Sequence, residues 1–153
     1  MLTAWRITKS EYAADAFSGD GAALYAGRWH SEGIRIVYTA ETISLATLEI
    51  LVHLHDRRRI PGYVIIPCYF PEAVVEELDA TKLPSNWAAA ISPPDLRRFG
   101  DQWANHRVSA VLKIPSAVTQ VELNYLLNPE HPDFRSVDIG EPRSFHLDVR
   151  LYT

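Results

Sequence analysis

The sequence predicts an α+β fold in a single domain. Short runs rich in β-branched and aromatic residues, typical of strands, are interspersed with only a few helical segments. Strand and helix do not alternate regularly, as they would in a doubly wound parallel sheet. A length of 153 residues fits one domain that can bury a substantial core. We therefore expect one compact α+β domain over residues 1–153.

The first half of the chain contains three predicted strands and two predicted helices. Pro67 interrupts the third strand and favours an edge position or a bulge there. Thr39 or Thr42 would cap the longer helix. A glycine-rich segment, SGDGAALYAGRWHSEG, predicts a flexible loop. The expected elements are a strand at Trp5–Ile7, a short helix at Glu11–Phe17, a strand at Arg35–Thr39, a helix at Ile43–Leu54 and a strand at Tyr63–Phe70.

The second half reads as further short strands around one helix. Prolines open the helical segment, where they are well tolerated. Phe145, Leu147 and Val149 alternate with polar residues, as the inward face of a strand would. The expected elements are a segment at 72–83 that fits strand or helix equally, a helix at Pro94–Asn105, a strand at Val108–Ile114, an extended segment at Val121–Leu127 and a final strand at Arg143–Leu151.

The composition argues against several classes of function. A net charge of -4 disfavours nucleic acid as the main ligand, because binding to phosphate backbones requires a basic surface. A single cysteine rules out a disulfide framework and disfavours a cysteine-based zinc site. The longest apolar stretches are too short to span a bilayer, and the N-terminus lacks the features of a signal peptide. We expect a cytoplasmic protein.

Glu49 is the most informative residue for function. It is the only charged side chain in ISLATLEILVHL, and a helix that is apolar on all sides is usually buried. A buried carboxylate is costly unless a cation pairs with it or a ligand uses it. The run contains no Lys or Arg to pair with it, so Glu49 is a candidate catalytic carboxylate. His53 lies one helical turn away, but no further metal-ligand set accompanies it, so we expect no metal.

The glycine-rich loop contains a candidate anion-binding group. Arg28 stands between a glycine and Trp29, and a guanidinium binds phosphate or carboxylate through two hydrogen bonds. The ring of Trp29 could stack on the same ligand. The alternative is a surface arginine beside a core tryptophan, and residue type alone favours it; the unpartnered Glu49 raises the weight of the functional interpretation.

Three more side chains are candidates for contact with a ligand. Tyr38 ends a predicted strand just before the Glu49 helix, where ligand-facing groups are common. Ser116 follows another strand, and Asn124 precedes a turn. The structural alternatives are a half-buried strand tyrosine, a turn serine and a turn-forming asparagine. No Gly-x-Ser-x-Gly motif supports Ser116 as a nucleophile.

Taken together, these segments resemble the RES-domain family, the toxins of bacterial toxin–antitoxin pairs named for an arginine, a glutamate and a serine. The matching stretches are WRI, then GAALYAGRWHSEGIRIVYTAETISLATLEILVHL, then IPSAV and NYLLNPEHPDF. They span nearly the whole chain in order. One departure is His30, where the family pattern has asparagine.

The resemblance implies a fold related to ADP-ribosyltransferase toxins and cleavage of the nicotinamide–ribose bond of NAD+, which is substrate rather than cofactor. By this resemblance Glu49 and Arg28 are catalytic. Tyr38 orients the nicotinamide end, and Ser116, Trp29 and Asn124 contact the substrate. Arg6 is a further candidate, either for the anionic part of NAD+ or for pairing with Glu49.

The resemblance also implies an inhibitory partner, a helix-turn-helix (Xre-like) antitoxin. The acceptor of ADP-ribose stays open among phosphate, water and a protein, so the chain is an NAD+ phosphorylase, a glycohydrolase or a protein ADP-ribosyltransferase. A nucleotide-binding module without catalysis is the alternative from another class. The sequence leaves self-association as a homodimer open.

Overall fold

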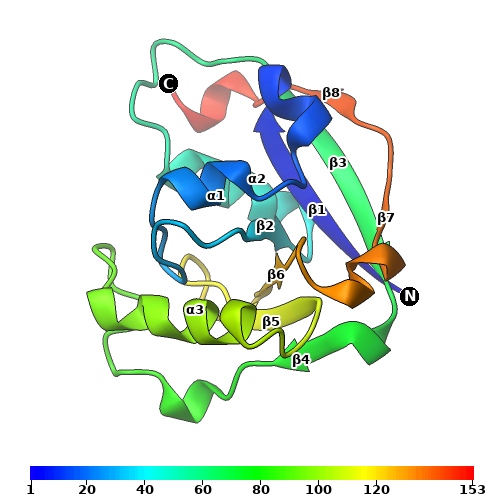
Figure 1. The fold of residues 1–153 in the computed structure, drawn as a ribbon. Coiled ribbons are helices and arrows are strands. Elements are labelled where there is room, and N and C mark those ends of the chain that lie inside the picture. The colour runs from blue at the N-terminus through cyan, green and yellow to red at the C-terminus, as the bar shows by residue number, and fades with distance from the viewer.

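A curled eight-stranded sheet forms the centre of the molecule (Figure 1). The computed structural model describes all 153 residues. The strands follow the order β4-β5-β6-β2-β1-β3-β7, and β8 also pairs with β3. Only β4 and β5 are parallel. The strands are β1 Leu2–Lys9, β2 Val37–Ala40, β3 Tyr63–Phe70, β4 Val75–Glu77, β5 Val111–Pro115, β6 Leu123–Leu127, β7 Asp138–Ile139 and β8 Arg143–Phe145.

The sheet divides into two halves that meet at one residue pair. Between β1 and β2 the only bridged pair is Trp5 with Ala40. By contrast, β1 and β3 pair along their whole length, from Leu2 opposite Phe70 to Lys9 opposite Tyr63. The strands β4, β5, β6 and β2 therefore form one half, and β1, β3, β7 and β8 form the other.

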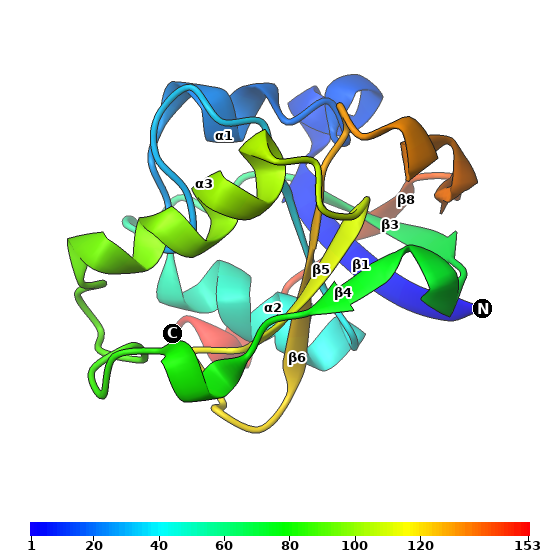
Figure 2. The same cartoon turned by 60° about the horizontal axis from the view of Figure 1, so that its bottom comes forward.

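Three α-helices pack around the sheet: α1 Asp20–Leu24, α2 Ile43–Val52 and α3 Arg97–Asn105. Figures 1 and 2 place α3 between α1 and the strands β4 and β5. Leu96 and Trp103 anchor the α3 region in a core cluster with side chains of β5 and β6. Leu45 and Ala46 anchor α2 against β1, β2 and β3. No helix of the structure is long and apolar enough to cross a membrane.

The expectation that α2 is buried on all sides was wrong. Its position and its cap were as expected, since the Thr42 hydroxyl accepts a hydrogen bond from the backbone N–H of Leu45. However, Ile43, Leu48 and Val52 are 38 to 57% exposed. The helix packs on the sheet with one face only, and no other element covers its outer face.

Two expectations about strands also need correction. Pro67 lies inside the continuous strand β3, between β1 and the outer strands, rather than at an edge. It is tolerated because it falls between the segments of β3 that pair with β8 and with β7, where its missing N–H leaves no ladder bond unmade. The predicted final strand ends at Phe145, and Val149 begins a 3₁₀ turn with its side chain exposed.

The remaining elements agree with the sequence in type, with shifted limits. The short helix near the N-terminus is a 3₁₀ helix at Ser10–Asp15. The ambiguous segment at 72–83 forms the short strand β4 between two 3₁₀ turns. The glycine-rich loop contains the short helix α1.

Candidate functional site

Glu49 lies at the junction of α2 with the β5–β6 hairpin. The hydroxyl of Ser116, just after β5, donates a hydrogen bond of 3.2 Å to Glu49 Oε1. Asn124 is the second residue of β6, pairs with Ala40 and shares its face of the sheet, so it also faces α2. The structure therefore brings Glu49, Ser116 and Asn124 together from segments that lie far apart in the sequence.

The start of α2 is fixed to β6 by reciprocal contacts. The backbone N–H of Glu41 donates to Leu123 O, and the N–H of Leu123 donates to the Glu41 side chain. The Thr42 hydroxyl donates to the side chain of Glu122. These contacts set the position of the helix, and hence of Glu49, relative to the hairpin.

Ser116 is fully buried, and its hydrogen bonds show which group accepts its hydroxyl proton. Its Oγ accepts from the backbone N–H groups of Val118 at 3.1 Å and Thr119 at 3.3 Å. The remaining partner is the Glu49 carboxylate, which only accepts, so the hydroxyl proton points there. We expected Ser116 to contact the substrate, but the structure directs its proton to Glu49. Its role is to position that carboxylate.

Replacing Ser116 with alanine tests this role. Ser116→Ala leaves two partly buried N–H groups without their acceptor, and each such loss costs up to about 1–3 kcal/mol of stability. It also removes a donor that favours the ionised form of Glu49, so the pKa of Glu49 should rise further. If Glu49 must be ionised for activity, the acid limb of the pH profile of kcat/KM should move to higher pH. An unmoved acid limb would contradict this role.

Burial raises the pKa of Glu49 above its ordinary value. Ser116, His53, Asn124 and Arg28 oppose this shift, in descending order. Glu49 forms no salt bridge with any cation, so the suggested direct pairing of Arg6 with Glu49 is not met. A half-buried carboxylate without a cationic partner is poised to interact with a positively charged ligand group.

Arg28 is held by backbone carbonyl groups rather than by an acidic residue. Its Nη1 donates to Trp87 O at 3.0 Å and to Ala89 O at 2.9 Å. Neither Nε nor Nη2 has a hydrogen-bond partner in the protein, and neither is a buried orphan. The guanidinium therefore keeps its charge and one of its edges available for an anion.

Tyr38 and His30 hold the glycine-rich loop in place. His30 Nε2 faces two carbonyl oxygens, of Ala22 at 2.8 Å and Tyr25 at 3.0 Å, so this nitrogen must donate. In the neutral ring, Nδ1 then accepts from the Tyr38 hydroxyl, 2.6 Å away. This network assigns the tautomer of His30. A Cβ on Gly27 would lie within 3 Å of the His30 ring and of the Tyr38 hydroxyl, so a larger residue there would displace this network.

The expected ligand contact of Trp29 is not supported. Its side chain is only 3% exposed and packs in the core cluster of β5, β6 and α3. Its backbone N–H lies 3.4 Å from the Tyr38 hydroxyl oxygen, which accepts it. Trp29 therefore anchors the loop from inside, whereas the neighbouring Arg28 is only half-buried.

Removing the Tyr38 hydroxyl should separate its structural role from any ligand contact of the ring. Tyr38→Phe leaves His30 Nδ1 and the Trp29 N–H without a partner, which we expect to cost about 1–3 kcal/mol of stability. Chemical denaturation measures this cost. The phenyl ring stays, so ligand affinity at temperatures where the variant is folded should change little. A loss of affinity without a loss of stability would show that the hydroxyl contacts the ligand.

Arg6 lies on the other face of the sheet from α2. Side chains alternate along β1, so Arg6 shares a face with Ala4, which packs with Phe17 and Cys68. Ile7, on the opposite face, packs in the cluster of α2. The structure therefore does not bring Arg6 together with Glu49.

Arg6 instead bridges the two halves of the sheet where they separate. Its Nη1 donates to Tyr38 O at 3.0 Å, beyond the single bridged pair of β1 and β2. Its Nε is buried without a partner. Burial lowers the pKa of Arg6 to about 10. Arg6 thus supports the strand that carries Tyr38.

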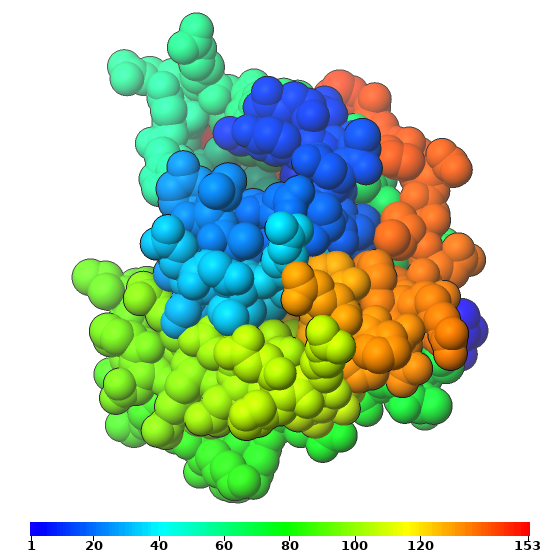
Figure 3. Space-filling view, in the orientation of Figure 1, coloured from blue at the N-terminus to red at the C-terminus, as the bar shows by residue number.

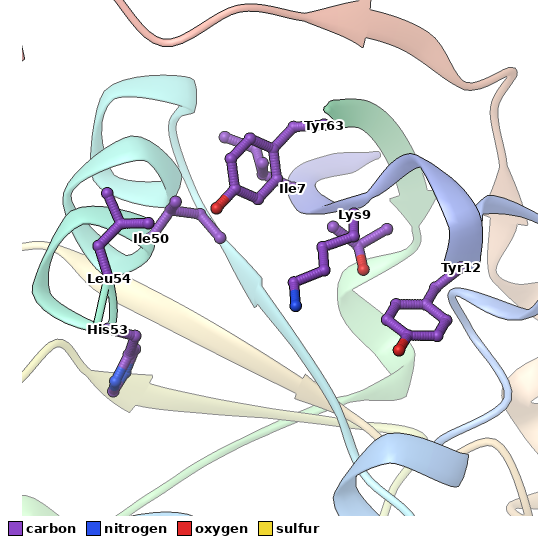
Figure 4. A pocket seen from close by; sticks show the side chains of 8 residues that line it. Ile7, Lys9, Tyr12, Ile50, His53, Leu54 and Tyr63 are labelled. Carbon is purple, nitrogen blue, oxygen red and sulfur yellow. The ribbon is translucent and has the colours of Figure 1, made fainter. Parts of the chain in front are cut away.

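A cavity of about 270 Å³ adjoins the C-terminal end of α2 (Figure 4). Its floor is apolar, and Lys9 and His53 lie at its rim without an acidic partner. Figure 3 shows the surface hollowed at the upper left, between the blue N-terminal segment and the chain after α2. Glu49 itself does not line this cavity, although His53 lies four residues after it in the sequence. The lining residues are Ile7, Thr8, Lys9, Tyr12, Ile50, His53, Leu54 and Tyr63.

Comparison with known proteins decides the family. The RES domain profile matches residues 3–148. The chain belongs to the RES domain family. A Photorhabdus laumondii protein named Toxin Res is 37% identical over 148 residues, covering 96% of this chain and 95% of that one. A Sphingobium protein named Prs ADP-ribosylating toxin is 34% identical over 152 residues, covering 96% of this chain and 94% of that one.

A solved structure shares the fold of this RES domain. A chain of the M. tuberculosis MbcT–MbcA toxin–antitoxin complex superposes with a TM-score of 0.78. The match covers 99% of this chain and 86% of the other, at 16% sequence identity. The curled sheet with its α-helices is therefore an architecture found in a known toxin–antitoxin complex.

Sequence reasoning missed several residues that shape this RES-domain site. Asp101 of α3 accepts from the backbone N–H of Ser31 at 2.7 Å and from its hydroxyl at 2.5 Å. Gly100, one residue earlier, lets α3 approach the carbonyl of Trp29. The carbonyls of Trp87 and Ala89 hold Arg28. No local pattern in the sequence indicates these contacts, because each joins segments about 60 to 70 residues apart.

Proposed function

We propose that the chain is the toxin of a bacterial toxin–antitoxin pair and that it cleaves the nicotinamide–ribose bond of NAD+. The observation that carries this proposal is Glu49, a half-buried carboxylate without a salt-bridge partner, which Ser116 holds by a hydrogen bond and whose raised pKa is partly offset by the charge of Arg28. Such a site offers a negative group for a developing cation and a positive group for a pyrophosphate.

The chemistry needs one carboxylate. As the bond between C1′ of the ribose and N1 of nicotinamide breaks, its electron pair goes to N1, and nicotinamide leaves as a neutral molecule. Positive charge develops on the ribose, and Glu49 stabilises that charge electrostatically or holds the ribose hydroxyls. No general acid is required for the leaving group. An acceptor oxygen then bonds to C1′, and a water acceptor releases its proton to solvent.

The other residues divide the recognition of NAD+ among them. Arg28 presents its free Nε and Nη2 edge to the pyrophosphate. Asn124, beside Glu49, is placed to contact the ribose or the carboxamide. The ring of Tyr38 orients the nicotinamide end, since its hydroxyl is already engaged with His30.

The raised pKa of Glu49 suits this role. Burial strengthens the interaction of the carboxylate with a positive transition state, because the surrounding dielectric is low. The cost is a weaker tendency to ionise, and Ser116 and Asn124 offset part of that cost. The site therefore provides a carboxylate whose charge is less screened by water than that of an exposed side chain.

The named relatives support the toxin role and ADP-ribosyl chemistry. Toxin Res of Photorhabdus laumondii aligns over nearly the whole chain, and the Sphingobium relative is named for ADP-ribosylation of Prs. The second name keeps a protein acceptor as an alternative to phosphate or water. The fold is shared with a chain of a toxin–antitoxin complex, which supports an antitoxin as the partner; its helix-turn-helix (Xre-like) type is our proposal from the family resemblance. NAD+ and such a partner would meet this chain in the cytoplasm.

Product analysis tests the proposal. The purified chain is incubated with NAD+, with and without inorganic phosphate, and the products are identified by mass. Nicotinamide plus ADP-ribose indicates a glycohydrolase, and nicotinamide plus a phosphorylated ADP-ribose indicates a phosphorylase. Release of nicotinamide only when a protein acceptor is added indicates a transferase. Binding of NAD+ without any release of nicotinamide would overturn the proposal in favour of a binding module.

A further inference from the structure

Residues 84–93 form a connection without helix or strand, which we call the strap. It leads from the β4 side of the sheet to the start of the α3 region. Its internal backbone bonds are two tight turns, from Trp87 N to Pro84 O and from Ala89 N to Asn86 O. The hydrogen bonds that reach it from a distant part of the chain are the two from Arg28. Arg28 and the strap therefore fix each other.

Trp87 connects the strap to the core as well as to Arg28. Its ring lies 6.3 Å from the ring of Trp29, centroid to centroid, at an angle of 41°. Trp29 is itself buried in the core cluster. Trp87 thus contacts two adjacent residues of the glycine-rich loop, Trp29 through its ring and Arg28 through its carbonyl oxygen.

This arrangement places the guanidinium before any ligand arrives. Both bonds to the strap use Nη1, which leaves the opposite edge of Arg28 without a protein partner. A free arginine side chain loses rotamer freedom when a ligand immobilises it, and this loss weakens binding. Because the strap already holds the Arg28 side chain in the folded protein, less of this freedom is lost when the ligand binds.

We propose that Trp87 is a positioning residue for NAD+, acting through Arg28. Anchored on Trp29, it holds the carbonyls that orient the guanidinium toward the pyrophosphate. The inference rests on the proposed function and deepens it. Because Trp87 acts on an anion-binding group and not on Glu49, its loss should weaken substrate binding and leave the chemical step intact.

Steady-state kinetics of two substitutions at this position test the inference. Trp87→Ala should raise KM for NAD+ roughly three- to tenfold, the range that the ordering cost of one side chain implies, while kcat stays within about twofold. Trp87→Phe keeps an aromatic anchor and should restore most of the affinity. Leu83→Ala is the matched control, because Leu83 packs against the same cluster and makes no contact with Arg28. It should lower the melting temperature without changing KM.

The outcomes separate this inference from the proposed function. An unchanged KM in Trp87→Ala, with only a lower melting temperature, would overturn the positioning role. A fall in kcat with unchanged KM would overturn it as well. If the wild-type chain releases no nicotinamide, the proposed function fails, and ADP-ribose then serves as the probe in calorimetry. Weaker binding of ADP-ribose by Trp87→Ala would support the positioning role, and equal binding or no binding by either protein would overturn it.

Discussion

Glu49→Gln should slow the turnover of NAD+ severely without destabilising the protein. A single group that stabilises transition-state charge commonly contributes roughly a hundred- to a thousandfold in rate, and we expect a loss of that order. Glutamine keeps the size of the side chain and its acceptor for the Ser116 hydroxyl. The measurements are nicotinamide release and thermal unfolding at neutral pH.

The stability effect has a defined sign and pH window. Burial raises the pKa of Glu49 in the folded protein, so the folded state binds the proton more tightly than the unfolded state. Wild-type stability therefore falls as the pH rises from the ordinary pKa of 4.5 through the raised value. Glutamine removes this loss, so the variant should be at least as stable as wild type at neutral pH, with the advantage vanishing below the ordinary pKa.

An exposed glutamate elsewhere in the chain provides the control for Glu49→Gln. Glu32→Gln changes an exposed glutamate in the glycine-rich loop that makes no hydrogen bond or salt bridge, and it should leave both rate and stability unchanged. Full turnover by Glu49→Gln would show that the carboxylate is not used in catalysis. Loss of the folded state would show instead that Glu49 is a structural residue.

Gly100→Ala should destabilise the protein severely. A Cβ at this position would lie 1.9 Å from the carbonyl oxygen of Trp29 and 3.0 Å from its carbonyl carbon. Both atoms belong to backbone that is fixed, by the buried ring of Trp29 on one side and by the hydrogen bonds of Asp101 to Ser31 on the other. Overpacking in a well-packed core costs about 1–3 kcal/mol and sometimes more. We expect at least the upper end of this range, measured by chemical denaturation.

The same substitution should also disturb the site, because α3 would have to move away from the loop that carries Arg28. Gly21→Ala is the matched control: Gly21 lies in α1, and a Cβ there meets nothing within 4 Å. Since alanine favours a helix over glycine by up to about 1 kcal/mol, this control should be neutral or stabilising. A Gly100→Ala variant with wild-type stability would contradict the close contact between α3 and the loop.

The sequence predicted the helices and strands better than it predicted which elements pack against them. The apolar run of α2 correctly indicated a helix at Ile43, and the capping threonine set its start. The apolar residues on the outer face of α2 did not indicate that this face would be exposed. The composition of a helix does not show which other elements will pack against it. For the same reason, alternation at the C-terminus indicated a strand where only Arg143–Phe145 finds a pairing partner in β3.

For the site, residue type indicated the charged groups but not their partners. Glu49 was identified as an unpartnered carboxylate, and it forms no salt bridge in the structure. Its contact with Ser116 spans 67 residues, and that of Arg28 with the strap spans about 60. Contacts between residues so far apart in the sequence depend on the order of the strands in the sheet. Local sequence patterns do not show that order. Trp29 and Arg28 are adjacent in sequence, yet Trp29 is buried in the core and Arg28 is half-buried and bonded to the strap.

The most direct test of the account is the release of nicotinamide from NAD+ by the purified wild-type chain, followed in parallel with Glu49→Gln. The account predicts nicotinamide and an ADP-ribosyl product in equal amounts from wild type. The variant should release nicotinamide at a rate lower by a factor of roughly a hundred or more. Intact NAD+ after prolonged incubation with folded wild-type protein, with phosphate and protein acceptors supplied, would contradict it.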